Sequence, residues 1–311
     1  MALSYTQNLE DYHLWVALKG KQTGFYIDVG AGHPVADNVS FWFYERGWRG
    51  MVIEPQPRLA EMYPFVRPRD ICVTSLVGKC EGDTEFYRFD RLHGLSTMNP
   101  KFAQGGAKHG DHYEVVRKPV TTLARLCSEH AVGEIDFLKI DVEGAEGEVL
   151  AGNDWKRFRP KLVVAEAIVL ETGQPSWDDW EPFLLAQGYE FALFDTLNRF
   201  YVAIEQKDVL RSVPRERAPW GSATHMYEIG KSPDNPAHPD HVLAVELSRA
   251  FWAQLPRLDA DFLSSLLAAH TNLSNDARSE LAKELRTERS KAALARIACA
   301  YDGGQIDPLK S

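Results

Sequence analysis

Long apolar runs, closely spaced cysteines and repeats are all missing from this sequence of 311 residues. No stretch of about 18 consecutive apolar residues occurs, so we expect no membrane-spanning helix. The four cysteines form no CxxC pair and are too few for a disulfide scaffold. We therefore predict free thiols and a reducing, cytoplasmic location. Because neither an internal repeat nor a low-complexity tract is present, a repeat architecture is excluded.

Positive charge is also scarce, since 35 Lys and Arg face 44 Asp and Glu, a net charge of −9. This balance argues against bulk binding to nucleic acid or to an anionic membrane surface. The N-terminal segment contains Glu10 and Asp11 and lacks a basic stretch before an apolar core, so no signal peptide is expected. Hydrophobic residues make up 44% and charged residues 25%, which is typical of globular proteins. The length predicts one large domain with an appendage, or two domains.

Short apolar runs rich in β-forming residues alternate with helical patterns over most of the first two thirds of the chain. This alternation is typical of βαβ units, so we predict an α/β fold around a mostly parallel sheet. The expected strands are 25–27, 50–53, 71–76, 82–89, 135–140, 162–165, 189–194 and 200–204. The expected helices are 38–46, 57–63, 121–130, 145–150 and 177–187. Residues 90–119, rich in glycine and histidine, are predicted to form one long functional loop.

The final pair of strands flanks a short turn at 195–199, which predicts an antiparallel hairpin at one edge of the sheet. Beyond the hairpin the pattern changes, and the proline-rich segment 232–240 is typical of a linker. Residues 241–301 show apolar side chains at helical spacing. We therefore predict a main domain at 1–230 and a helical C-terminal extension at 231–311. These helices are expected to pack against the main domain or against a second copy of the chain in a homodimer.

A glycine pair follows the first predicted strand, in the segment Asp-Val-Gly-Ala-Gly that starts at Asp28. Gly30 and Gly32 allow a tight turn and a close approach of the backbone to a ligand. A dinucleotide fingerprint needs a third glycine where the chain has Val35, which also argues against a nucleotide-dependent oxidoreductase. We therefore predict an adenosine cofactor without a pyrophosphate at this turn, S-adenosylmethionine. Its carboxylate would meet the N–H groups of Gly30, Ala31 and Gly32, and Asp28 would interact with its amino group. Taken alone, the motif is also typical of a simple tight turn.

Two further side chains are predicted to contact the cofactor. Glu54 ends the next strand, 24 residues after Gly30, where a carboxylate hydrogen-bonds ribose hydroxyls in adenosine-cofactor folds. The alternative for Glu54 is an exposed acid before Pro55. Asn38 is predicted as a helix N-cap, and it also lies where the cofactor carboxylate could approach.

Residues 137–146 carry the most information about chemistry. An apolar strand delivers Asp141 to its carboxyl end, and such ends line the ligand crevice of open α/β sheets. Asp141 is therefore expected to face the cofactor or the acceptor. Glu146 could act there too, or could complement the positive end of the helix that follows. Glu166 ends the next strand in the same way.

Five segments, in this order, resemble the FkbM family of S-adenosylmethionine-dependent methyltransferases. They are 26–32, 50–55, 94–96, 120–123 and 135–146. The resemblance implies a Rossmann-like class I methyltransferase sheet with seven strands, the last one antiparallel. It also implies transfer of a methyl group to oxygen, commonly to a hydroxyl of a sugar or a polyketide-type natural product. Family domains also occur within larger glycan-assembly proteins, of which this chain could be a segment.

An alcohol acceptor needs a general base, or a metal ion that acidifies it. By position the candidate bases are Asp141, then Glu166, then His93, for which a solvated loop histidine is the alternative. Asp141 and Glu166 could instead hold Mg²⁺ or Mn²⁺ together with a loop histidine, but we favour catalysis without a metal. Ser96 lies in a segment that matches the family near its active site, so it is predicted to touch cofactor or acceptor. Local hydrogen bonding in a turn is the alternative for this hydroxyl.

The sequence thus predicts an S-adenosylmethionine-dependent O-methyltransferase acting on a hydroxyl of a sugar, glycan or related polyhydroxylated natural product. Its partner would be a small-molecule or glycan acceptor, with no nucleic acid and no membrane span. Acceptor specificity is expected in 90–119 and 206–229. The alternative is a catalytically inactive adenosine-cofactor-binding module that serves the assembly of a larger glycan-biosynthesis protein. The enzyme is favoured by the intact motif residues Asp28, Gly30, Gly32, Glu54 and Asp141.

Overall fold

The computed structural model describes residues 3–89, 92–109, 112–169, 172–226, 236, 238, 240–271 and 273–301. The chain divides into two compact units, Met1–Met226 and Tyr227–Ser311. The domain boundary predicted at residue 230 lies within 227–235, outside the described residues. In the described part of the chain, no helix combines the length and the apolar character needed to cross a membrane.

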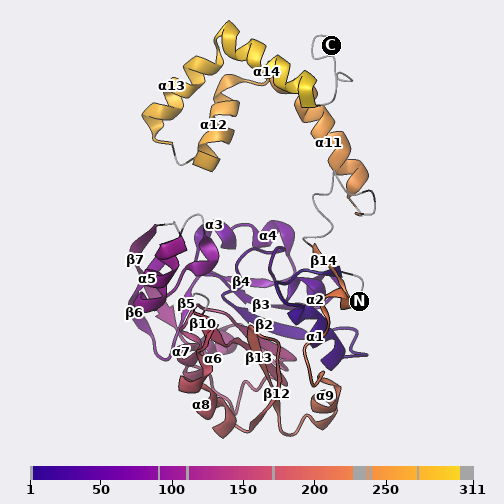
Figure 1. The fold of residues 1–311 in the computed structure, drawn as a ribbon. Helices are drawn as coiled ribbons and strands as arrows, with labels where there is room; N and C mark the ends of the chain where they lie inside the picture. Colours follow the sequence, from indigo (N-terminus) through magenta and orange to yellow (C-terminus); the bar gives the residue numbers. More distant parts are fainter. Residues whose placement is uncertain are drawn as a thin grey trace. The chain divides into compact units, whose positions relative to one another are not determined.

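A mainly parallel sheet of seven strands forms the centre of the first unit (Figure 1). In spatial order these strands are β12 (Tyr189–Phe194), β13 (Asn198–Ala203), β9 (Leu162–Glu166), β8 (Phe137–Ile140), β2 (Phe25–Val29), β3 (Arg49–Ile53) and β4 (Ile71–Val73). β13 is the last of them along the chain and runs antiparallel to both of its neighbours. The predicted seven-stranded α/β sheet, its antiparallel last strand and the hairpin at its edge are therefore confirmed.

Helices cover both faces of this sheet. Since alternate residues of each strand point to opposite faces, neighbouring residues of one strand pack into two different cores. Ile27 and Val29 of β2 belong to a core that includes side chains of α6 (Leu123–Glu129), α7 (Glu146–Ala151) and α8 (Glu181–Ala186). Tyr26 of the same strand belongs to a second core, with side chains of α1 (Glu10–Ala17), α2 (Phe41–Glu45) and α9 (Lys207–Ser212). The central strands β8 and β9 are buried along their whole length, which explains their nearly continuous apolar runs.

The first unit also contains a three-stranded sheet in the order β5 (Leu76–Val77), β7 (Tyr113–Thr121) and β6 (Gly82–Phe89). The prediction of one long loop over 90–119 is therefore wrong. The described part of that segment contains η1 (His93–Leu95), α5 (Pro100–Gly106), η2 (Ala107–His109) and most of β7. β7 pairs antiparallel with β6 along the whole length of β6, and this distant partner is what makes the segment a strand. The predicted strand 71–76 is likewise divided, because β4 joins the large sheet and β5 the small one.

Prolines divide or shorten two of the predicted helices. The helix expected at 57–63 is replaced by α3 (Pro57–Ala60) and α4 (Tyr63–Val66), each with a proline in its first turn. Proline has no N–H to donate, so it suits the start of a helix and not its interior. The helix expected at 177–187 begins as η3 (Trp177–Asp179) and continues as α8, which also has a proline in its first turn.

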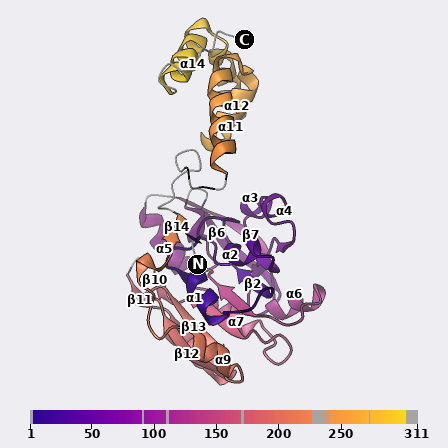
Figure 2. The same cartoon turned by 90° about the vertical axis from the view of Figure 1, so that its right-hand side faces the viewer.

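The helix expected at 38–46 is shorter, and Ser40 occupies the N-cap position of α2. The predicted N-cap role of Asn38 is therefore wrong. The remaining short elements of this unit are β1 (Leu3–Ser4), β10 (Ile168–Val169), β11 (Gln174–Pro175), η4 (Trp220–Ser222) and β14 (Thr224–His225). β1 pairs with β14, which brings the N-terminal strand beside the end of this unit (Figure 2).

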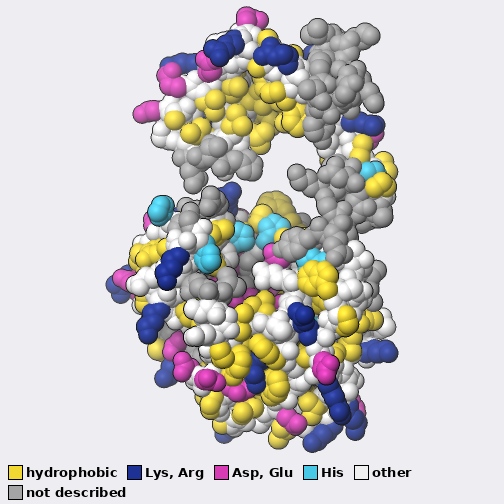
Figure 3. Space-filling model, in the orientation of Figure 1, with side chains coloured by type: hydrophobic (Ala, Val, Ile, Leu, Met, Phe, Trp, Pro, Cys, Tyr) yellow, Lys and Arg dark blue, Asp and Glu magenta, His cyan; other side chains and the backbone are white. Residues whose placement is uncertain are grey.

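The second unit consists of helices, as its sequence pattern predicts. They are α11 (His241–Gln254), η6 (Leu255–Arg257), α12 (Ala260–Thr271), α13 (Asn275–Leu285) and α14 (Glu288–Tyr301). Leu255, Leu263 and Ala298 form a small buried core. Large apolar side chains of α11 and α12 remain exposed, and Figure 3 shows hydrophobic side chains gathered on one face of this unit.

A buried arginine connects several parts of the first unit. Arg67 follows α4, and its side chain is fully buried together with that of its ion-pair partner Asp70, 2.7 Å away. The guanidinium also donates to Tyr26 Oη (3.0 Å), Ser40 Oγ (2.8 Å) and Asn38 Oδ1 (2.8 Å). Asp70 in turn accepts a hydrogen bond from the backbone at the start of β3. The charge of Arg67 therefore holds β2, β3 and the turn before α2 together.

Replacing this arginine should destabilise the first unit strongly. Arg67→Met leaves the carboxylate of Asp70 buried without its cation, so we expect the free energy of unfolding to fall by about 3–5 kcal/mol. Urea unfolding of the full chain, followed by tryptophan fluorescence, measures this change. The control Arg211→Ala removes an exposed i,i+3 ion pair with Asp208 and should cost no more than about 0.5 kcal/mol. Equal losses in the two variants would contradict the connecting role of Arg67.

Candidate active site

A pocket lies at the carboxyl ends of β2, β3 and β8, the edge at which ligands bind in open α/β sheets. The sequence-predicted residues that line it are Gly30, Gly32, Glu54, His93, Ser96 and Asp141. The predicted residues that are not part of its lining are Asp28, Ala31, Asn38 and Glu166. The other lining residues are Val29, Ile53, Pro55, Gln56, Ser75, Leu76, Val77, Phe86, Gly94, Thr97, Met98 and Val142. The walls are thus largely apolar, with a few polar groups that converge on the pocket.

The glycine turn is shaped by contacts inside the protein. Gly30 and Gly32 both have positive φ, 75° and 61°. A Cβ on Gly30 would lie 1.7 Å from the carbonyl oxygen of Asp141, whereas a Cβ on Gly32 would meet no atom within 4 Å. The N–H groups of Gly30 and Ala31 both donate to the carbonyl of Ile53. Gly30 therefore lets the residue after β8 approach the turn, whereas the space beside Gly32, which also lines the pocket, is open.

Glu54 is a buried carboxylate in the pocket wall, with only 2% of the residue exposed. The alternative of an exposed acid before a proline is therefore wrong. Oε2 accepts from the N–H of Gly32 (2.8 Å) and Oε1 from the N–H of Gln56 (2.8 Å). Burial, opposed by these bonds, raises the pKa of Glu54 to about 7. Each oxygen keeps a lone pair for a hydroxyl donor, so this side chain can still bind a ligand.

Asp28 and Asn38 support the turn from inside the protein. Asp28 accepts from the hydroxyl of Ser40 (2.6 Å), and burial raises the pKa of its carboxyl group. Asn38 Nδ2 donates to the carbonyl of Ala31 (2.8 Å), and its Oδ1 accepts from Arg67. Both residues are almost fully buried. Their polar atoms therefore fix the shape of the turn from the side away from the pocket lining.

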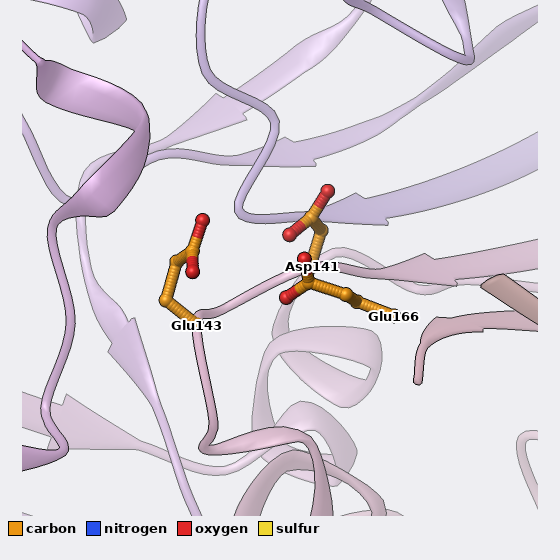
Figure 4. Close-up of side chains that lie close together, drawn as sticks. All are labelled: Asp141, Glu143 and Glu166. Carbon is orange, nitrogen blue, oxygen red and sulfur yellow. The ribbon is translucent and has the colours of Figure 1, made fainter. Parts of the chain in front are cut away.

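Three carboxylates meet where β8 and β9 end. Asp141 follows β8, Glu166 ends β9, and Glu143 lies on the turn before α7 (Figure 4). One oxygen of each lies within 4.8 Å of the others. Glu166 is 4% exposed, while the side chain of Asp141 is 40% exposed. Burial and the nearby carboxylates of Asp141, Glu143 and Glu146 raise the pKa of Glu166 well above its ordinary value.

Lys139 is a site residue that the sequence analysis missed. Its Nζ lies 2.8 Å from Oδ2 of Asp141, and its side chain is 4% exposed. Lys139 and Asp141 are two residues apart at a strand end, so both point to the same face, and Lys139 is also the register partner of Asp28 in β2. The signal for it was a single charged residue inside an otherwise apolar strand. Glu143 was missed as well, because only the fold brings it to Glu166.

The turn after Asp141 is held by a buried side chain. Glu146 Oε1 accepts from the N–H groups of Val142 (3.2 Å) and Gly144 (3.1 Å). Burial raises the pKa of Glu146 to about 7. Of the two roles considered for Glu146, the structural one at the start of the helix is observed.

His93 and Ser96 lie on the segment that covers the pocket. His93 is half-buried, burial lowers the pKa of its imidazole, and its Nδ1 is buried with no hydrogen-bond partner among the described residues. Gln56 Nε2 donates to the carbonyl of His93 (2.9 Å), which ties this segment to the end of β3. The hydroxyl of Ser96 accepts from the N–H of Phe89 (3.0 Å). Ser96 thus has a local hydrogen bond and a place in the pocket lining.

Comparison with known proteins identifies the family of this domain. Residues 28–191 match the sequence model of the methyltransferase FkbM domain, over more than half of the chain. The matched residues include the glycine turn, Glu54 and the three carboxylates. No curated protein matches the chain. The match confirms the resemblance inferred from the sequence.

The two glycines of the turn should respond differently to an added methyl group. Gly30→Ala combines a left-handed backbone with a clash against Asp141, so we expect a loss of about 2–5 kcal/mol in the free energy of unfolding. Gly32→Ala has the backbone cost alone, about 1–2 kcal/mol. Urea unfolding of both variants measures the difference. Similar losses would show that β8 does not press against Gly30.

Proposed function

Since the chain belongs to the FkbM methyltransferase family, we propose that it is an S-adenosylmethionine-dependent O-methyltransferase with a class I, Rossmann-like sheet. Its acceptor is a hydroxyl of a sugar, glycan or related polyhydroxylated natural product. One observation carries the proposal: one pocket is lined by both the buried carboxylate of Glu54 and the partly exposed carboxylate of Asp141. The first suits a ribose and the second suits an acceptor hydroxyl.

The residues of the pocket fit this cofactor. Glu54 is a buried acceptor whose remaining lone pairs can receive ribose hydroxyls. The apolar side chains of Ile53, Leu76 and Phe86 offer a surface for an adenine ring, and the open side of Gly32 leaves room beside it. When bound, S-adenosylmethionine supplies an electrophilic methyl group on a sulfonium, whose C–S bond breaks with its electron pair staying on sulfur.

The chain's own residues prepare the acceptor. A neutral hydroxyl is a poor nucleophile, and removal of its proton during attack contributes roughly 10²–10⁴-fold in rate. Asp141 is the first candidate to take that proton, because it lines the pocket and Lys139 fixes one of its oxygens. Glu166 stands next to it, and the imidazole of His93, whose pKa burial lowers, also lines the pocket. The apolar walls exclude water, which would compete with the acceptor.

The charge of the site supports a neutral, polyhydroxylated acceptor. Asp141, Glu143 and Glu166 together would repel an anionic substrate, while their oxygens can accept several hydroxyl hydrogen bonds. This fits the acceptor class that the family resemblance implies. The inactive module considered as the alternative is disfavoured, because the glycine turn and the carboxylates are all in place.

Two wider proposals concern the chain as a whole. The exposed apolar side chains of α11 and α12 support a homodimer formed through the helical unit. The thiols of Cys72, Cys80 and Cys127 are free, which supports action in a reducing compartment, the cytoplasm.

Removing the charge of Asp141 should abolish turnover and spare cofactor binding. Asp141→Asn keeps the size of the side chain, so we expect methyl transfer to fall about 10²-fold or more. The affinity for S-adenosylhomocysteine, measured by calorimetry, should change by less than about 3-fold. Methyl transfer is followed with labelled S-adenosylmethionine against a panel of mono- and oligosaccharides. Asp208→Asn, an exposed carboxylate on α9, is the control. Unchanged turnover would remove Asp141 from the mechanism.

Cofactor binding should weaken as Glu54 takes up a proton. The pKa of Glu54 is raised to about 7, so its carboxylate is mostly ionised at pH 8 and mostly protonated at pH 6. Hydrogen bonds from ribose hydroxyls are stronger to the ionised form, so the affinity for S-adenosylhomocysteine should fall about 5–10-fold from pH 8 to pH 6. Calorimetry across this range measures it. Glu54→Gln should bind more weakly and lose the pH dependence. A variant with wild-type affinity would contradict ribose binding by Glu54.

A further inference from the structure

The carboxylates at the ends of β8 and β9 have the spacing of a metal site. We infer that Asp141, Glu143 and Glu166 bind one hard divalent cation, such as Mg²⁺ or Mn²⁺, through oxygen ligands. One oxygen of each lies within 4.8 Å of the others (Figure 4). Opposite ligands of one ion lie about 4.2 Å apart around Mg²⁺ and about 4.8 Å apart around Ca²⁺. The three oxygens can therefore surround one ion with only small movements of their side chains.

Glu166 supplies an observation of its own. Only 4% of the residue is exposed, and among the described residues its carboxylate has neither a hydrogen bond nor an ion pair, although its oxygens are not wholly shut off from solvent. Buried polar groups in folded proteins nearly always have a partner, because leaving a charge unpaired out of water is costly. The side chain extends from β9 toward Asp141 (Figure 4). A cation between these carboxylates would be the missing partner.

The local charges leave room for a further cation. The charged groups that act most on Glu166 are the carboxylates of Asp141, Glu143 and Glu146 and the ammonium of Lys139. Lys139 is committed to Oδ2 of Asp141, at 2.8 Å. This ammonium is therefore paired with Asp141 and not with Glu166. A divalent ion between Asp141 and Glu166 would supply the positive charge that Glu166 lacks.

The turn that carries Glu143 is held in place independently of any ligand. The hydroxyl of Thr97 donates to the carbonyl of Glu143 (2.7 Å), and Asn99 Nδ2 donates to the carbonyl of Gly144 (3.1 Å). Thr97 also lines the pocket, so these bonds fix the turn against the pocket wall. Glu143 is thus presented from a braced backbone, as a ligand must be.

The ligand set selects the kind of ion and its role. Three carboxylates without sulfur or imidazole suit Mg²⁺, Mn²⁺ or Ca²⁺, and about three of six positions would remain for water or an acceptor hydroxyl. If the proposed function holds, a cation here makes a bound hydroxyl more acidic. Asp141 would then be a ligand, and the proton would pass to the imidazole of His93 as the C–O bond forms and the C–S bond breaks. This is the metal-assisted alternative to the catalysis without a metal that the sequence analysis favours.

Binding of Mn²⁺ to the full chain tests the site without any acceptor. Titration followed by the EPR signal of free Mn²⁺ should show one site per chain, from which Mg²⁺ displaces Mn²⁺. Glu166→Gln and Glu143→Gln should each weaken Mn²⁺ binding about 10-fold or more. Circular dichroism shows whether each variant folds. If Glu166→Gln, a change at a buried residue, does not fold, Glu143→Gln still tests the site because Glu143 is only half-buried.

Glu148→Gln is the matched control, since Glu148 is an exposed acid on α7 outside the cluster. Its Mn²⁺ affinity should equal that of the wild type. The inference is overturned if the folded wild-type protein binds no Mn²⁺ up to about 10 mM. This is about ten times the dissociation constant of the weakest protein Ca²⁺ sites, roughly 1 mM. It is also overturned if Glu148→Gln weakens binding as much as the other two. A parallel titration with S-adenosylhomocysteine separates the two claims, because its binding tests the proposed function and not the cation site.

Discussion

Negative charge held partly or wholly out of water, at one edge of the sheet, is the constraint on which the rest of this structure depends. Four strands of the large sheet carry a carboxylate at or beside their carboxyl ends: Asp28, Glu54, Asp141 and Glu166. Each is costly to desolvate unless something compensates it. The chain supplies a different partner to three of them: a hydroxyl, two backbone N–H groups and an ammonium. Glu166 is the one for which we infer a cation as partner.

This arrangement ties the two halves of the pocket to each other. The carbonyl of Asp141 lies against Gly30, so the glycine turn, for which we propose a cofactor contact, and the strand end that carries Asp141 are in direct backbone contact. Behind the turn, Arg67 and Asn38 fix the same loop through buried hydrogen bonds. In the proposed function, one rigid frame would thus position cofactor and acceptor, which is what alignment of a displacement reaction requires.

Local patterns were informative where burial alone decides the structure. The strands that became β2, β3, β8 and β9 are short apolar runs, and their burial in the sheet requires that composition. The residues at their ends, Glu54 and Asp141, could therefore be placed in the pocket by counting. The segment 90–119 could not, because β7 is half-exposed and exists through its pairing with β6. The structural role of Asn38 was hidden for a similar reason, since its main partner Arg67 comes from a distant turn.

The sequence by itself determined the family, the α/β alternation, the order of the motifs and the carboxylates that end the strands. Those features are local, and a strand's end or a glycine pair can be read without knowing what lies beside it. Only the tertiary structure decided which groups meet. It showed that Lys139 pairs with Asp141, that Glu143 comes to Glu166, and that the N–H groups of the glycine turn are already in use. Such contacts join residues through the packing of separate strands and turns, and no local pattern encodes their distances.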